Sequence, residues 1–105
     1  MMKKALIICA AGMSSSMIAK KLTDYFSENG KEIEVDATTI SKGPSLIQKD
    51  AYDLYMVSPQ AKMQFKNLKA EADKKDKPII NIPPQTYVPI PTATQKLAGI
   101  VEESL

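Results

Sequence analysis

The stretch that decides the fold runs from Lys4 to Met17 and reads KALIICAAGMSSSM. The continuous apolar run Ala5–Cys9 predicts a strand buried on both faces, because an edge strand alternates apolar and polar residues. Small residues and Gly12 follow, then three serines, and a helical pattern begins at Ser16. A buried strand that passes through a glycine- and serine-rich segment into a helix is typical of the first unit of a parallel α/β sheet.

Apolar runs and helical patterns alternate through the rest of the chain, which predicts successive βαβ units. In the second apolar run, Ile33, Val35 and Ala37 alternate with acidic residues, which suits the edge of a sheet. With right-handed crossovers, we expect a four-stranded parallel sheet in the order 2-1-3-4 with helices on both faces. The predicted strands are Ala5–Cys9, Ile33–Ala37, Leu54–Val57 and Ile79–Ile82.

The helices are predicted from the spacing of apolar residues, from N-cap residues and from residues that end a helix. The first has Met17, Ile18, Leu22, Tyr25 and Phe26 at three- and four-residue spacing, so these side chains are expected to face the core. Proline fits the first turn of a helix, and serine and threonine fit the N-cap. The predicted helices are Ser16–Asn29, a short one after Gly43-Pro44, a long one with Ser58 as N-cap that ends at Lys74–Lys77, and a last one capped by Thr92.

Size and composition narrow the class of protein. A chain of 105 residues suits one domain with one core, so we expect a single domain over residues 1–105. The net charge is +2, and 14 lysines without arginine are interleaved with 12 acids, a mixed surface that predicts no nucleic-acid partner. One cysteine and no histidine exclude an internal disulfide, the usual zinc ligand sets and histidine acid–base chemistry. No cofactor or metal is predicted.

The apolar run near the N-terminus is short. It covers only Ala5–Ala11 before the serines, too few residues for a signal peptide or a membrane span. We therefore expect a soluble cytoplasmic protein that does not insert into the membrane.

Cys9 is the candidate functional residue. Ligands of open α/β sheets bind beyond the carboxyl ends of the strands where the winding reverses, which here lies between strands one and three. The unpaired N–H groups and the dipole of the following helix favour an anion the size of a phosphate. They also lower the pKa of a nearby thiol from its usual value of about 8.5. These features favour a nucleophilic cysteine over the alternative of an inert, buried one. The predicted anion-binding loop comprises Ala10, Ala11, Gly12, Met13, Ser14, Ser15 and Ser16.

The pattern Cys-x-x-Gly-Met-Ser-Ser-Ser resembles the enzyme IIB component of the lactose/cellobiose (chitobiose) class of the bacterial phosphoenolpyruvate-dependent sugar phosphotransferase system. The stretch LYMVSPQ at Leu54–Gln60 and the chain length fit the same family. The resemblance implies a fold like that of low-molecular-weight tyrosine phosphatases. It also implies that Cys9 accepts a phosphoryl group from a phosphohistidine of enzyme IIA, holds it as phosphocysteine within the loop, and passes it to a sugar bound by the membrane enzyme IIC. Tyr87 is a possible wall of this site, with packing over the sheet edge as its alternative role.

Two other functions compete with the relay. A low-molecular-weight phosphatase or arsenate reductase has an arginine six residues after its cysteine, where this chain has Ser15, and the chain contains no arginine. Such phosphatases also use a late aspartate as general acid, but no Asp or Glu occurs from Lys77 to Val101. A non-catalytic flavin- or nucleotide-binding domain is the third possibility, although the chain has no tryptophan and few aromatic residues to stack on a ring.

Overall fold

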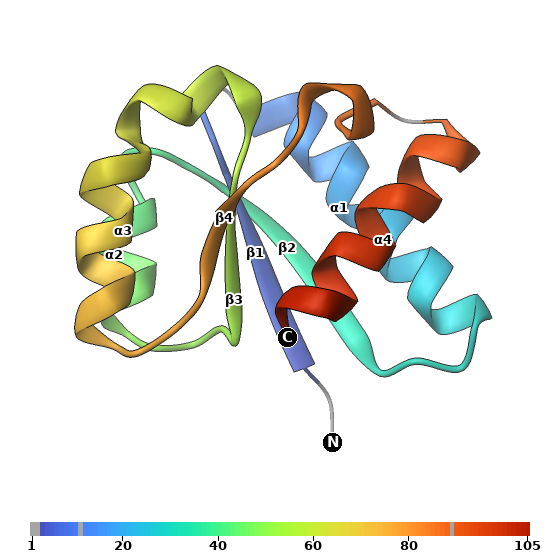
Figure 1. Cartoon of the computed structure of the whole chain (residues 1–105), viewed down its shortest axis with the longest axis horizontal. Helices are drawn as coiled ribbons and strands as arrows, with labels where there is room; N and C mark the ends of the chain where they lie inside the picture. The colour runs from blue at the N-terminus through green and yellow to red at the C-terminus, as the bar shows by residue number, and fades with distance from the viewer. Residues whose placement is uncertain (1–2, 11, 89) are drawn as a thin grey trace.

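The computed structural model describes residues 3–10, 12–88 and 90–105. A four-stranded parallel sheet in the order β2-β1-β3-β4 lies between two helical layers (Figure 1). This confirms the predicted strand order. The strands are β1 Lys3–Cys9, β2 Ile33–Thr39, β3 Leu54–Val57 and β4 Ile79–Asn81. The helices are α1 Gly12–Glu28, α2 Gly43–Gln48, α3 Phe65–Lys74 and α4 Pro91–Ser104, with short 3-10 helices η1 Pro59–Gln64 and η2 Pro84–Thr86.

The sheet separates two apolar cores, and successive residues of each central strand point into opposite ones. On one face, Ala5 and Ile7 of β1 and Met56 of β3 pack under α1 and α4. On the other face, Ile8 of β1 and Val57 of β3 pack under α2 and α3. Figure 1 shows α1 and α4 together on one side of the sheet and α2 and α3 on the other. We call these the α1/α4 face and the α2/α3 face.

Strand β1 is paired on both sides, with β2 and with β3. Its residues from Ala5 to Ile8 are completely buried, which explains why this run carries no polar residue. Strand β2 lies at the edge of the sheet, and Val35 is its only fully buried residue. The continuous apolar run of β1 and the alternating run of β2 therefore correctly predicted a central strand and an edge strand.

The first helix begins earlier than predicted. Helix α1 starts at Gly12 rather than Ser16, so Gly12 to Ser16 belong to its first turns and not to a loop. Serine is tolerated there because its hydroxyl can bond to backbone groups at the start of a helix. One face prediction was also wrong: Met17 is 52 % exposed, whereas Ile18, Leu22 and Phe26 are buried.

Two predicted caps are absent. Ser58 precedes η1 with extended backbone angles (φ −66°, ψ 158°), but its side chain makes no capping hydrogen bond, and the α-helix begins only at Phe65. The last helix begins at Pro91, after Ile90, and not after Thr92. In both cases a proline occupies the first helical position, where its fixed φ suits the turn without help from a side chain.

Candidate functional site

Cys9 is the last residue of β1, and α1 begins three residues later. Its carbonyl oxygen accepts a hydrogen bond from the Ile40 N–H (2.9 Å), which fixes the backbone against the end of β2. The residue is only 2 % exposed. The cysteine therefore lies at the carboxyl edge of the central strand, at the predicted point in the topology.

Tyr87 brings a hydroxyl group to the sulfur. It follows η2, and its Oη donates a hydrogen bond to Cys9 Sγ over 3.6 Å in a buried setting. Its own backbone N–H donates to the Pro84 carbonyl (3.1 Å), and the Thr86 hydroxyl donates to the Pro83 carbonyl (2.8 Å). The tyrosine ring also belongs to the core of the α1/α4 face. Tyr87 thus contacts the cysteine and also packs in the core of the α1/α4 face.

The predicted anion loop is mostly helical. Ala10 is exposed between β1 and α1, while Ala11 lies outside the described residues. Gly12, Met13 and Ser14 are the first residues of α1, and their side chains are not described. Ser15 is completely buried and Ser16 is exposed. The first turn of a 17-residue helix thus begins beside Cys9, and the N–H groups of such a turn have no partners within the helix and favour an anion.

Ser58 also lies at this end of the sheet, where the sequence predicted it only as a helix cap. It follows β3 directly, and its backbone N–H donates to the Ile8 carbonyl (3.0 Å), next to Cys9 in the chain. The residue is completely buried, and its Oγ has no hydrogen-bond partner among the described residues. The sequence signal was a serine at the end of a central strand, but helix capping offered a sufficient explanation for it.

Several other kinds of site are not found in the described parts of the chain. No group of three His, Cys, Asp or Glu residues there could hold a metal ion. Within residues 3–10, 12–88 and 90–105, no helix combines the length and apolar character needed to cross a membrane.

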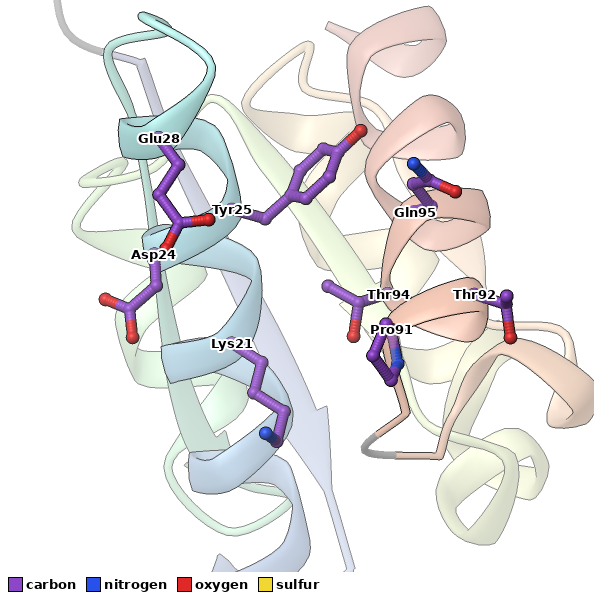
Figure 2. Close-up of a pocket in the computed structure, with 8 residues that line it drawn as sticks. All are labelled: Lys21, Asp24, Tyr25, Glu28, Pro91, Thr92, Thr94 and Gln95. Atoms are coloured by element: carbon purple, nitrogen blue, oxygen red, sulfur yellow. The ribbon is translucent and has the colours of Figure 1, made fainter.

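The pocket drawn in Figure 2 lies away from the cysteine. It is an open groove of about 440 Å³ between α1 and α4. Cys9 and Tyr87 do not line it, and its walls contain no nucleophilic thiol. The lining residues are Lys21, Asp24, Tyr25 and Glu28 of α1 and Pro91, Thr92, Thr94 and Gln95 of α4.

Known proteins share both the sequence pattern and the fold. Residues 4–98 match the family model "PTS system, Lactose/Cellobiose specific IIB subunit". The oligo-beta-mannoside-specific EIIB component of the phosphotransferase system of Bacillus subtilis is 33 % identical over 73 residues, which is 70 % of this chain and 69 % of that protein.

Two solved structures share the fold. The lactose-specific IIB domain from Streptococcus pneumoniae superposes with a TM-score of 0.84 at 18 % identity, covering 99 % of this chain and 98 % of that one. The cellobiose-specific IIB component from Borrelia burgdorferi superposes with a TM-score of 0.74 at 22 % identity, covering 99 % of this chain and 92 % of that one. With the family match over residues 4–98, the chain belongs to the lactose/cellobiose-specific IIB subunits of the sugar phosphotransferase system.

Proposed function

We propose that Cys9 accepts a phosphoryl group from a phosphohistidine of enzyme IIA and passes it to a sugar bound by the membrane enzyme IIC. The position of Cys9 carries this proposal: the chain's single cysteine ends the central strand, precedes the start of α1 and receives a hydrogen bond from Tyr87. The relatives' names support a sugar of the lactose or cellobiose class, or an oligo-β-mannoside. The reaction takes place in the cytoplasm.

The chemistry consists of two displacements at phosphorus. In the first, the Cys9 thiolate attacks the phosphorus, the S–P bond forms, and the P–N bond breaks with its electron pair returning to the donor imidazole. In the second, a sugar hydroxyl attacks, the O–P bond forms, the S–P bond breaks, and the thiolate is regenerated. The hydroxyl proton leaves to a base supplied by the transporter. Between the two steps, the phosphoryl oxygens receive hydrogen bonds from the first-turn N–H groups of α1 and from Tyr87 Oη.

The surroundings of Cys9 suit a carrier better than a hydrolase. The chain has no arginine to bind phosphoryl oxygens in a bidentate manner, and the segment from Lys77 to Val101 has no carboxylate to activate water or protonate a leaving group. An anion site that lacks both groups binds the phosphoryl group without accelerating its hydrolysis. Phosphocysteine then persists until the acceptor arrives.

Four exposed apolar side chains lie on segments that follow the strands or begin α1 at this end of the sheet. Met17 is in the second turn of α1, Met63 is in η1 after β3, and Val88 and Ile90 follow η2 after β4. Their exposed fractions are 52 %, 88 %, 38 % and 51 %. We propose that these side chains contact enzyme IIA. Because Cys9 itself is nearly covered, we infer that docking of enzyme IIA displaces part of this cover and gives access to the sulfur.

Intact-protein mass spectrometry tests the relay. After incubation with phosphoenolpyruvate, the general phosphotransferase components and a cognate enzyme IIA, the wild-type protein gains one phosphate on Cys9. The Cys9→Ser variant gains none and stays folded by circular dichroism, because the two side chains are nearly isosteric. A stable phosphate on a serine or threonine of the wild-type protein, or no phosphate at all, contradicts the proposal.

A further inference from the structure

In the unphosphorylated protein, the hydroxyl group of Ser58 is buried and makes no hydrogen bond to the described residues. Ser58 is 0 % exposed, and its Oγ has no hydrogen-bond partner among the described residues. Burial of a hydroxyl costs free energy unless a hydrogen bond compensates for it. Folded proteins pair nearly all such groups, so an unpaired one calls for a specific explanation. Helix capping does not provide one, since the Ser58 side chain makes no capping bond to η1.

The sheet register puts Ser58 beside Cys9. Ile8 pairs with Val57, and the Ser58 N–H donates to the Ile8 carbonyl, so Cys9 and Ser58 form the next neighbouring pair across β1 and β3. Adjacent strands are about 4.8 Å apart, which brings the two side chains within reach of one bound group.

Alternation along the strand gives the direction of the Ser58 side chain. Met56 packs on the α1/α4 face and Val57 on the α2/α3 face. Because the Ser58 backbone is still extended, its side chain returns to the α1/α4 face. Tyr87, whose hydroxyl bonds to Cys9 Sγ, belongs to the core of the same face. The unpaired hydroxyl is therefore on the same side of the sheet as the sulfur.

We propose that Ser58 is a phosphoryl-binding residue, whose Oγ–H donates a hydrogen bond to a phosphoryl oxygen on Cys9. This rests on the relay proposed above. The partner that Ser58 lacks in the unphosphorylated protein is supplied when the cysteine is loaded. The bond is charge-assisted, so it favours the phosphorylated state over the free thiol. The strand end β3 thereby contributes a third donor, next to the start of α1 and Tyr87.

The test compares Ser58→Ala with Tyr55→Phe. Tyr55 is a matched control because its Oη is also buried without a hydrogen-bond partner, while its ring packs on the opposite, α2/α3 face. In the unphosphorylated state, both variants should melt at or above the wild-type temperature, since each loses an unpaired buried hydroxyl.

The loaded state should separate the two variants. At equilibrium with phosphorylated enzyme IIA, Ser58→Ala should shift the phosphoryl distribution toward IIA by about tenfold, measured by intact-protein mass spectrometry. Its phosphocysteine should also show a changed ³¹P chemical shift. Tyr55→Phe should match the wild type in both measurements.

Two results would overturn the role of Ser58. One is a Ser58→Ala protein that loads to the wild-type equilibrium with an unchanged ³¹P shift. The other is a Ser58→Ala protein that melts well below the wild type, because that loss would show that the hydroxyl already has a structural partner. A wild-type protein that does not load at all would instead refute the relay, and this inference with it.

Discussion

At the scale of single residues, Cys9 and Tyr87 lie 78 positions apart in the chain and meet in the fold. Cys9 could be predicted from its place at the end of an apolar run and before a helix. Tyr87 could be named only through a family resemblance, because nothing in its local sequence indicates which side chain its hydroxyl contacts. Ser58 was predicted only as a helix cap, because its unpaired hydroxyl becomes visible only when burial is known.

Removal of the Tyr87 hydroxyl should slow the reactions of Cys9. The Oη–Sγ hydrogen bond is long at 3.6 Å, so its free energy is expected to lie at the weak end of the range for hydrogen bonds. We therefore expect Tyr87→Phe to reduce the rate of Cys9 alkylation by iodoacetamide at pH 7 by about threefold. The control is Tyr25→Phe, which changes a half-buried tyrosine in the groove between α1 and α4. Equal alkylation rates for wild type and Tyr87→Phe would show that this bond does not activate the thiol.

Tyr52 should make stability depend on alkaline pH. Burial, and the hydrogen bond that its Oη donates to Asp36 (2.8 Å), raise the pKa of Tyr52 from 10.0 to about 12. Between these values the unfolded chain releases a proton that the folded protein keeps, which favours unfolding. The stabilisation of the folded state by Tyr52 is therefore complete below pH 10, and it is lost as the pH rises toward 12.

Urea unfolding at pH 8, 10 and 11 measures this effect. The free energy of unfolding should fall more steeply with pH in the wild-type protein than in Tyr52→Phe, while lysine titration affects both alike. Parallel curves for the two proteins would rule out a contribution from Tyr52.

At the scale of elements, the periodicity of apolar residues predicted which strands and helices exist and in what order, but it did not predict where each helix starts. The strands were found because burial on one or both faces imposes a visible pattern on β1 and β2. The start of α1 was misplaced because three serines were interpreted as a loop, although the buried Ser15 forms part of the helix. A residue that suits both a loop and the first helical turn carries no boundary information by itself.

Two helical glycines should respond to alanine in opposite directions. A Cβ on Gly43 of α2 would lie 3.2 Å from Ile8 Cγ2 and 3.3 Å from Leu68 Cδ2, both in packed side chains, so Gly43→Ala should lower the free energy of unfolding by about 1 kcal/mol. A Cβ on Gly99 of α4 would meet no described atom within 4 Å, so Gly99→Ala should raise it by about 0.5 kcal/mol. Chemical denaturation measures both values, and a Gly43→Ala protein as stable as the wild type or more stable would refute the packing argument for α2.

At the scale of the whole molecule, the strand order determines where the site lies. With β1 and β3 in the centre of the sheet, Cys9 and Ser58 end adjacent strands, and η2 brings Tyr87 to the same end from beyond β4. Topology rules could predict this meeting point because crossover handedness leaves few alternatives. They could not predict that the cysteine is covered, since that depends on how the segment after β4 packs.

The whole chain also lacks what a phosphatase requires, so hydrolysis of p-nitrophenyl phosphate should be negligible. No arginine is present anywhere, and Ser15, at the position where such enzymes place one, is completely buried in α1. The measurement is steady-state release of p-nitrophenol by wild type and by Cys9→Ser, and neither should exceed background. Many turnovers per minute by wild type alone would identify a hydrolase.

The double pairing of β1 has a consequence for amide hydrogen exchange. The carbonyls of Ile8 and Cys9 are held from opposite sides, by the amides of Ser58 and Ile40. These bonds extend the two ladders of β1 by one residue on each side, so we expect both amides to exchange slowly. The amides of Ala61 in η1 and Thr86 in η2 instead donate to carbonyls three residues back, within single turns. We therefore expect the amides of Ser58 and Ile40, whose bonds flank Cys9, to exchange more slowly than the amides of η1 and η2.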